Sequence, residues 1–200
     1  MGSSFTLFLD ADDIVYRFHT YLNFVLSHQY DLPVAPDFIP HGWDYQEVTP
    51  DLKTIFKDLP KKWPLMLEVQ PGVRKFLTEI KNLNGKVVII TSLPTDQAPY
   101  RIEALIRDKI EFSEIYFTFQ ADKSEFIKAL KGRHSGPYFF VDDYLKNCNA
   151  SAAVVDKSFC YYTNYNIEHS PPQNTFMASS CEQMFHMIID HIKGVLSNEK

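Results

Sequence analysis

The sequence lacks the features typical of membrane-spanning, disulfide-stabilised and nucleic-acid-binding proteins. No apolar run approaches the roughly 18 residues that a membrane-spanning helix needs. Acidic residues (25) outnumber lysine and arginine (20), which argues against a surface for the phosphates of duplex nucleic acid. The three cysteines form no C-x-x-C pair, and the histidines are scattered; the cysteines are Cys148, Cys160 and Cys181. Free thiols in a reducing compartment fit best, so we expect a cytoplasmic protein that binds neither a membrane nor duplex nucleic acid.

Apolar, β-branched runs alternate with helical patterns through most of the 200 residues. The runs predict strands over residues 6–9, 86–91, 115–119, 138–141 and 158–162. The helical patterns cover residues 73–83, 100–109, 123–130, a short stretch near 145, and 181–195. Continuous apolar strands that alternate with helices indicate a parallel sheet covered on both faces. We therefore predict an α/β fold with a doubly wound parallel sheet.

One segment near the N-terminus does not follow this alternation. Residues 31–50 are irregular and contain four prolines: Pro33, Pro36, Pro40 and Pro50. They separate a helical pattern over residues 14–30 from a short helix expected over 51–57. We interpret residues 15–65 as a small helical cap inserted after the first strand, into a core domain made of residues 1–14 and 66–200.

Polar residues follow four of the predicted strands. Ligands of an open parallel sheet bind outside the carboxyl ends of its strands, so these residues are expected to meet at one edge. They are Asp10 and Asp12 after the first strand, Thr91 and Ser92 after the second, Lys123 after the third, and Asp142 and Asp143 after the fourth. Like charges about 4 Å apart repel by ~4 kcal/mol even at an effective dielectric constant near 20. A divalent cation among the carboxylates would offset that repulsion.

These residue types together favour phosphoryl transfer. Oxygen ligands without histidine or cysteine indicate a hard cation such as Mg²⁺, which keeps waters and substrate phosphate among its ligands. Lys123 and the Thr91 hydroxyl can hold the other phosphate oxygens, and an aspartate can act as the nucleophile. Asp10, Asp12 and Asp13 are equally suited to cap the helix expected after them, and that alternative stays open for Asp13.

The order Asp10-x-Asp12, Thr91, Lys123, Asp142-Asp143, each motif closing an apolar strand, resembles the haloacid dehalogenase-like (HAD) phosphatase superfamily over residues 5–143. The resemblance implies a Rossmann-like core and a phosphoaspartyl intermediate on Asp10. Asp12 would protonate the leaving oxygen and later activate water. Mg²⁺ would be held by Asp10, the Asp12 carbonyl oxygen and Asp142, with Asp143 supporting through water.

Within that superfamily the chain is most similar to the 5'(3')-deoxyribonucleotidases. The likeness includes the small cap, Phe18 eight residues after Asp10, and the pairs Thr91-Ser92 and Asp122-Lys123. It implies a (deoxy)nucleoside monophosphate or a similar small phosphorylated metabolite as substrate, with contacts from Phe18 and Ser92. Trp43 is a further candidate for substrate contact because it lies in a loop directly after Gly42. Three positions depart from the family pattern: Asp13 stands in place of Gly, Ala121 in place of Arg, and Pro99 in place of Lys.

Two other functions stay open at this stage. A phospho-accepting signalling receiver also gathers acids, a hydroxyl and a lysine at strand ends, but in a different order along a shorter chain. A catalytically weak or inactive HAD-like protein that binds a phosphate ligand or a protein partner is compatible with the departures. The oligomeric state is not specified by the sequence, and a homodimer is one option.

Overall fold

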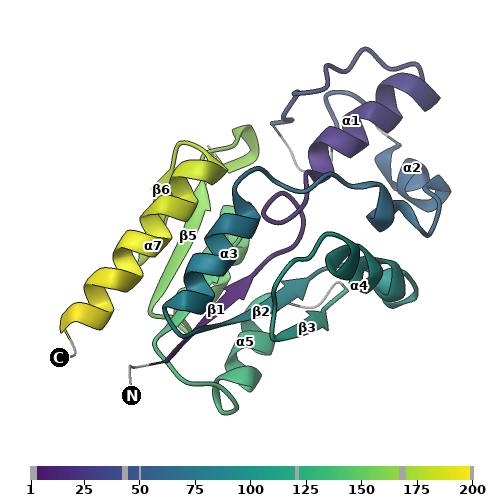
Figure 1. The fold of residues 1–200 in the computed structure, drawn as a ribbon. Coiled ribbons are helices and arrows are strands. Elements are labelled where there is room, and N and C mark those ends of the chain that lie inside the picture. The colour runs from purple at the N-terminus through teal and green to yellow at the C-terminus, as the bar shows by residue number, and fades with distance from the viewer. Residues whose placement is uncertain (1–3, 42–44, 50, 120–121, 167–169, 199–200) are drawn as a thin grey trace.

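The computed structural model describes residues 4–41, 45–49, 51–119, 122–166 and 170–198, and its centre is a six-stranded, all-parallel sheet (Figure 1). The strand order is β3-β2-β1-β4-β5-β6. The strands are β1 (Phe5–Leu9), β2 (Gly85–Thr91), β3 (Glu114–Phe117), β4 (Tyr138–Val141), β5 (Lys157–Tyr161) and β6 (Thr175–Ala178). This arrangement confirms the predicted doubly wound α/β fold.

Helices cover both faces of the sheet, and β1 shows why. Its residues alternate between two hydrophobic clusters: Leu7 packs on one face and Phe8 on the other. The Leu7 side is covered by α3 (Val73–Asn82), α4 (Ala98–Arg107) and α7 (Cys181–Asn198), and the Phe8 side by α5 (Lys123–Lys131) and α6 (Leu145–Ser151). Because β1 is buried on both faces, its sequence is a continuous apolar run rather than an alternating one.

The segment between β1 and α3 forms a small layer beyond the carboxyl ends of the strands (Figure 1). It contains α1 (Phe18–Gln29), α2 (Leu52–Asp58) and the short 3₁₀ helix η1 (Trp63–Met66). Its buried side chains, such as Leu22 and Ile55, belong to the same hydrophobic cluster as Leu7 of the sheet. The division into a cap of residues 15–65 and a core of 1–14 and 66–200 therefore remains a prediction about domains.

Two details of the fold differ from the sequence-based expectation. The helix expected from Ile14 begins only at Phe18, because residues 11–16 make a tight turn with Asp13 at φ 54°. Ile14, Val15 and Tyr16 of this turn are fully buried, so their apolar character reflects burial in a loop rather than a helix face. Strand β6 was not expected; it is a short edge strand that pairs only with β5.

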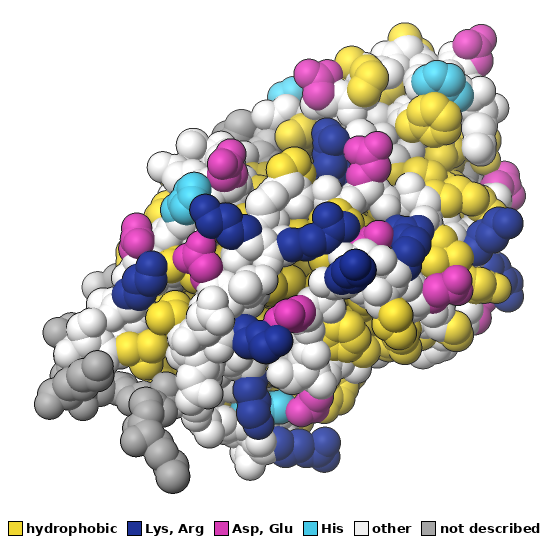
Figure 2. Space-filling view, viewed as in Figure 1, with side chains coloured by type: hydrophobic (Ala, Val, Ile, Leu, Met, Phe, Trp, Pro, Cys, Tyr) yellow, Lys and Arg dark blue, Asp and Glu magenta, His cyan; other side chains and the backbone are white. Residues whose placement is uncertain are grey.

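On the face shown in Figure 2, Lys and Arg side chains lie among Asp and Glu side chains. Among the described residues, no helix is long and apolar enough to cross a membrane.

Candidate active site

Asp10, Lys123 and Asp142 come from three separate elements and meet at the carboxyl edge of the sheet. Asp10 follows β1, Lys123 opens α5, and Asp142 follows β4. The Lys123 ammonium nitrogen Nζ lies 2.8 Å from Asp10 Oδ1 and 2.8 Å from Asp142 Oδ2. The three side chains are almost completely buried. Their convergence shows that the parallel topology brings these strand ends together, as the sequence predicted.

Asp143 completes a carboxylate cluster at this point. One oxygen each of Asp10, Asp142 and Asp143 lie within 4.8 Å of one another, a spacing that could hold a metal ion. The Tyr165 hydroxyl donates a hydrogen bond of 2.5 Å to Asp143 Oδ2. This contact orients one carboxylate oxygen of Asp143.

Among the described residues, Asp142 accepts hydrogen bonds from more groups than Asp10 or Asp143 does. Its Oδ1 accepts hydrogen bonds from the backbone N–H of Tyr144 (2.9 Å) and from Asn147 Nδ2 (3.0 Å). The Asn147 amide also lies 3.1 Å from Asp142 Oδ2. Asn147 was not predicted from the sequence; its place in the first turns of α6, five residues after Asp142, is the only signal that could have indicated it.

Burial shifts the pKa values of the charged groups in the cluster. It raises the pKa of Asp10 to about 7; Lys123 opposes this shift, whereas the charges of Asp142 and Asp12 add to it. Burial likewise raises the pKa of Asp143 well above its ordinary value, with Asp142 as the largest charge contribution. Burial alone would lower the pKa of Lys123, but the two neighbouring carboxylates outweigh it and raise that pKa. Three buried carboxylates facing one ammonium group are a donor set that fits a hard divalent cation.

Asp12 lies at the edge of this cluster and has a different partner. Its Oδ1 is 2.5 Å from Nη2 of Arg101, a side chain of α4 that is completely buried. The Asp12 side chain itself is 26% exposed. Asp12 is thus a partly accessible carboxylate beside the buried one, Asp10. Arg101 was visible in the sequence but carried no predicted role.

A cavity of about 530 Å³ opens above these carboxylates. Its polar lining comes from the strand ends, the short 3₁₀ helix η2 (Thr95–Gln97), the start of α5, and α6 with the residue before it, namely Asp10, Asp12, Asp13, Ser92, Gln97, Lys123, Asp143, Tyr144 and Asn147. Its apolar lining comes from both layers, namely Phe18, Phe56, Trp63, Leu93, Pro94 and Phe119. The volume and the mixture of apolar walls with a few convergent polar groups are typical of a small-molecule site.

The two hydroxyl residues after β2 lie in different environments. Ser92 lines the cavity, and its Oγ is 3.3 Å from Thr118 Oγ1. Thr91 is fully buried and does not line the cavity, and its hydroxyl has no hydrogen-bond partner among the described residues. Of these two residues, Ser92 is therefore the one whose hydroxyl lines the cavity.

The aromatic residues of the predicted substrate site are described only in part. Phe18 lines the cavity, and its ring stacks on Phe56 at a centroid distance of 6.0 Å and contacts Trp63 at 5.1 Å. Trp43 and the position of Ala121 lie outside the described residues. Pro99 lies in the first turn of α4, where a proline is well tolerated.

Asp13, which replaces the glycine of the family pattern, adopts the left-handed conformation that a glycine would favour. Its carboxylate accepts a hydrogen bond from the backbone N–H of His19 (3.1 Å) and pairs with His19 Nδ1. His19 stacks between Tyr45 and Tyr165. The aspartate thus links the loop after β1 to the first turn of helix α1, in line with the helix-capping alternative that the sequence left open for Asp13.

Solved structures with this fold are HAD-superfamily hydrolases. The chain is similar to D,D-heptose 1,7-bisphosphate phosphatase from B. bronchiseptica complexed with magnesium and phosphate (TM-score 0.61, 11% identity, 94% of this chain and 99% of that chain). It is also similar to a HAD-superfamily hydrolase, subfamily IA, from Geobacter sulfurreducens (0.60, 16%, 96% and 97%). A third neighbour is a β-phosphoglucomutase homologue from Thermotoga maritima (0.59, 16%, 93% and 99%). The chain has the Rossmann-like HAD fold.

At these identities the likeness concerns the fold. No protein-family model matches the chain, and no curated protein matches it by sequence. The HAD fold alone does not determine the reaction or the substrate, because one fold can carry many functions. The function of this protein therefore depends on the residues of its site.

Proposed function

We propose that the protein is a Mg²⁺-dependent phosphomonoesterase that uses Asp10 as its nucleophile. The observation that carries the proposal is the position of Lys123 between Asp10 and Asp142, with Asp143 beside them, beneath a cavity of small-molecule size. Phosphatase neighbours with the same fold support it, one of them complexed with magnesium and phosphate.

The carboxylates suit the metal, and each has a defined part in the proposed reaction. Asp10, Asp142 and Asp143 would hold Mg²⁺, together with the Asp12 carbonyl oxygen. When bound, the cation would neutralise negative charge on the cluster and on the phosphate. Lys123 would hold Asp10 in place and contribute positive charge where the phosphate binds. The Ser92 hydroxyl, and Thr91 behind it, would support the phosphate oxygens.

The proposed reaction has two steps. In the first, an Asp10 carboxylate oxygen bonds to phosphorus as the bond to the leaving oxygen breaks, and Asp12 gives that oxygen a proton. In the second, Asp12 takes a proton from water, which attacks the phosphorus and releases Asp10 and inorganic phosphate. Asp12 suits both steps because it lines the cavity and is partly exposed, whereas Asp10 is buried.

For the substrate we propose a (deoxy)nucleoside monophosphate or a similar small phosphorylated metabolite. Phe18, Phe56 and Trp63 contact one another and form an aromatic part of the cavity lining. Stacking of a base on an aromatic side chain contributes ~1–3 kcal/mol per base, so such a lining favours a planar leaving group. Most of the aromatic surface also packs within the protein, so this lining is preformed rather than assembled by the ligand.

A panel of phosphomonoesters assayed with and without Mg²⁺ tests the proposal. The panel would contain nucleoside 5'- and 3'-monophosphates with and without the 2'-hydroxyl, sugar phosphates and p-nitrophenyl phosphate. We expect Mg²⁺-dependent release of phosphate, with the highest kcat/KM for a nucleotide. Absence of turnover on every ester would instead support an inactive HAD-like scaffold, whereas a higher kcat/KM for a sugar phosphate would overturn only the substrate assignment.

A further inference from the structure

Arg101 is the largest fully buried side chain of the protein, and its one hydrogen-bonded anionic partner among the described residues is Asp12. Its Nη2 donates to Asp12 Oδ1 at 2.5 Å, whereas its Nε and Nη1 have no hydrogen-bond partner in the part of the chain that the structure describes. Burial of a charged group is strongly unfavourable unless it is paired. The Asp12 carboxylate supplies the negative charge that pairs with the buried guanidinium, so this contact stabilises Arg101 in its buried position.

Two aromatic rings fix the guanidinium in addition to Asp12. The central carbon Cζ of Arg101 lies 4.9 Å from the ring centroid of Tyr16 and 5.6 Å from that of Trp63. Tyr16 belongs to the buried turn that also carries Asp12, and the two residues form a backbone bridge. Trp63 belongs to η1 and lines the cavity. The guanidinium therefore has little freedom to leave the carboxylate.

Arg101 does not line the cavity, but Asp12 and Trp63 do. Arg101 therefore reaches a ligand in the cavity by contact only through these two side chains. Asp12 Oδ2 accepts no hydrogen bond from the described residues, so of the two carboxylate oxygens only Oδ1 is engaged.

We propose that Arg101 is a positioning residue that directs the proton of Asp12 to the oxygen Oδ2, from which it reaches the leaving group. Arginine is a hydrogen-bond donor only, so Oδ1 must act as an acceptor toward it in either charge state of Asp12. A proton on Asp12 is therefore held on Oδ2. This inference rests on the proposed phosphatase function: as the bond from Asp10 to phosphorus forms and the bond to the leaving oxygen breaks, the proton moves from Oδ2 to that oxygen.

The test compares two esters that differ in their need for an acid. An alkyl phosphate releases a poor leaving group and needs the proton, whereas p-nitrophenyl phosphate releases a stable phenolate and does not. In Arg101→Met we expect kcat/KM for the alkyl phosphate to fall ~100-fold, as for loss of a general acid, and that for p-nitrophenyl phosphate to fall no more than about three-fold. An equal fall for both esters would overturn the proposal and assign Arg101 a structural role.

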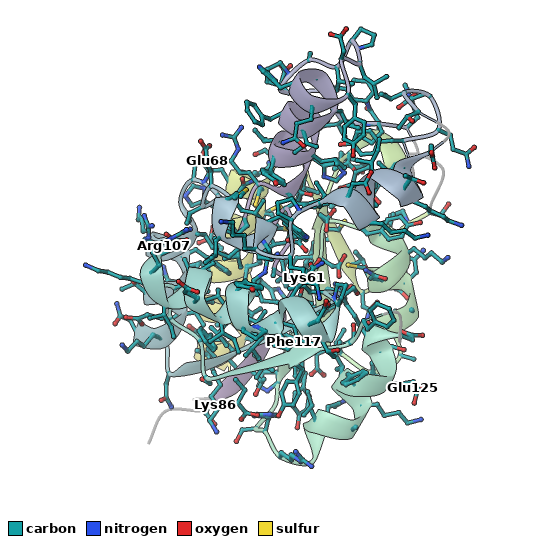
Figure 3. All side chains as sticks on the ribbon, turned by 90° about the vertical axis from the view of Figure 1, so that its right-hand side faces the viewer. Lys61, Glu68, Lys86, Arg107, Phe117 and Glu125 are labelled. Atoms are coloured by element: carbon teal, nitrogen blue, oxygen red, sulfur yellow. The ribbon has the colours of Figure 1, made fainter. Side chains whose placement is uncertain are left out.

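Two further variants sharpen the result. Arg107→Met is the matched control. Arg107 lies in the same helix as Arg101, but it points outward (Figure 3) and binds Asp108 and the Leu65 carbonyl. In this variant the ratio of kcat/KM for the alkyl phosphate to kcat/KM for p-nitrophenyl phosphate should not change. In an Asp12→Asn background, Arg101→Met should have no further effect on that ratio. An additional, independent loss there would contradict a role that acts through Asp12.

Folding and the underlying function are separated by the same measurements. If Arg101→Met does not fold, Arg101→Lys carries the test, because it keeps the charge but loses the planar fork of donors. Its ratio should fall by a smaller but measurable factor, and an unchanged ratio would overturn the proposal. A wild-type protein that hydrolyses no ester would refute the phosphatase function itself, whereas an active wild type with an unchanged ratio in the variants would refute only the role of Arg101.

Discussion

Asp13 and His19 form a buried hydrogen-bonded pair that joins the loop after β1 to helix α1. The Asp13 carboxylate accepts a hydrogen bond from the His19 backbone N–H and pairs with the imidazole Nδ1, although Asp13 has a positive φ of 54°. A left-handed conformation costs a non-glycine residue of the order of 1–2 kcal/mol. The pair therefore compensates for a backbone conformation that a glycine would adopt at less cost.

Replacement of Asp13 by glycine should lower stability and leave the reaction largely intact. The variant would relieve the backbone cost, but it would leave two buried His19 nitrogens unpaired, each at ~1–3 kcal/mol. The two unpaired nitrogens together cost ~2–6 kcal/mol and the relieved backbone returns ~1–2 kcal/mol, so we expect a net loss of about 2 kcal/mol, or a fall in Tm of about 4–8 °C for a chain of this size. Thermal unfolding in a cycle with His19→Phe measures the coupling. A more stable Asp13→Gly variant would show that backbone strain outweighs the pair.

Replacement of Asp10 by asparagine should abolish turnover without loss of the fold. Loss of a nucleophile typically lowers kcat by several orders of magnitude, and we expect a fall of at least ~10⁴-fold. The metal-free variant should be no less stable than the wild type, because one of three adjacent buried carboxylates becomes neutral. Glu125→Gln, the same change at an exposed residue of α5 (Figure 3), is the control. Retention of full activity by Asp10→Asn would contradict the nucleophile assignment.

The raised pKa of Asp10, about 7, sets the direction of a pH effect on stability and metal binding. In the metal-free protein Asp10 keeps its proton up to about pH 7, whereas in the unfolded chain it loses it near its ordinary pKa of about 3.9. The folded state thus binds more protons between these values, and the contribution of Asp10 to the free energy of unfolding falls as pH rises through them.

Mg²⁺ competes with that proton, so its affinity should rise with pH up to about 7. We expect the increase in Tm at a fixed Mg²⁺ concentration to be clearly larger at pH 7.5 than at pH 5.5. Thermal scans across this range measure it, and Asp10→Asn should flatten the dependence. An increase that does not vary with pH would show that Asp10 is not a ligand.

Replacement of Tyr165 by phenylalanine should weaken metal binding while keeping the ring that packs on His19. The hydroxyl donates to Asp143 Oδ2, and loss of such a supporting contact typically lowers metal affinity 10–100-fold. Calorimetric titration with Mg²⁺ should show a Kd about ten-fold higher. Tyr162→Phe, at an exposed tyrosine nearby in the chain, should leave the Kd unchanged. Equal affinities for all three proteins would mean that Asp143 needs no orientation by Tyr165.

The sequence was sufficient to predict the sheet and the meeting of its strand ends, because both follow from local patterns. Continuous apolar runs identified five of the strands, and parallel topology then required Asp10, Lys123 and Asp142 to approach one another. Strand β6 escaped prediction because its four residues follow a proline-rich segment and pair only at an edge.

The supporting residues of the site could not have been predicted in the same way. Arg101 and Tyr165 reach Asp12 and Asp143 across 89 and 22 residues of sequence, and each lies in a segment whose local pattern shows only a helix or a loop. Their roles depend on how helices dock on the sheet, which one sequence does not encode locally. Asp13 and His19 are close in sequence, but their contact depends on a buried turn. The apolar residues of that turn follow a helical pattern, so the sequence predicted a helix there.

Because the layer above the sheet shares one hydrophobic cluster with β1, α3 and α7, it is part of the same cooperative structure. Heat or denaturant should disrupt both in a single all-or-none transition, rather than releasing the smaller part first. Excision of that layer would expose apolar side chains of the shared cluster and favour self-association. We therefore expect a ligand to enter the cavity through small movements of individual aromatic rings, and not through separation of the whole layer from the sheet.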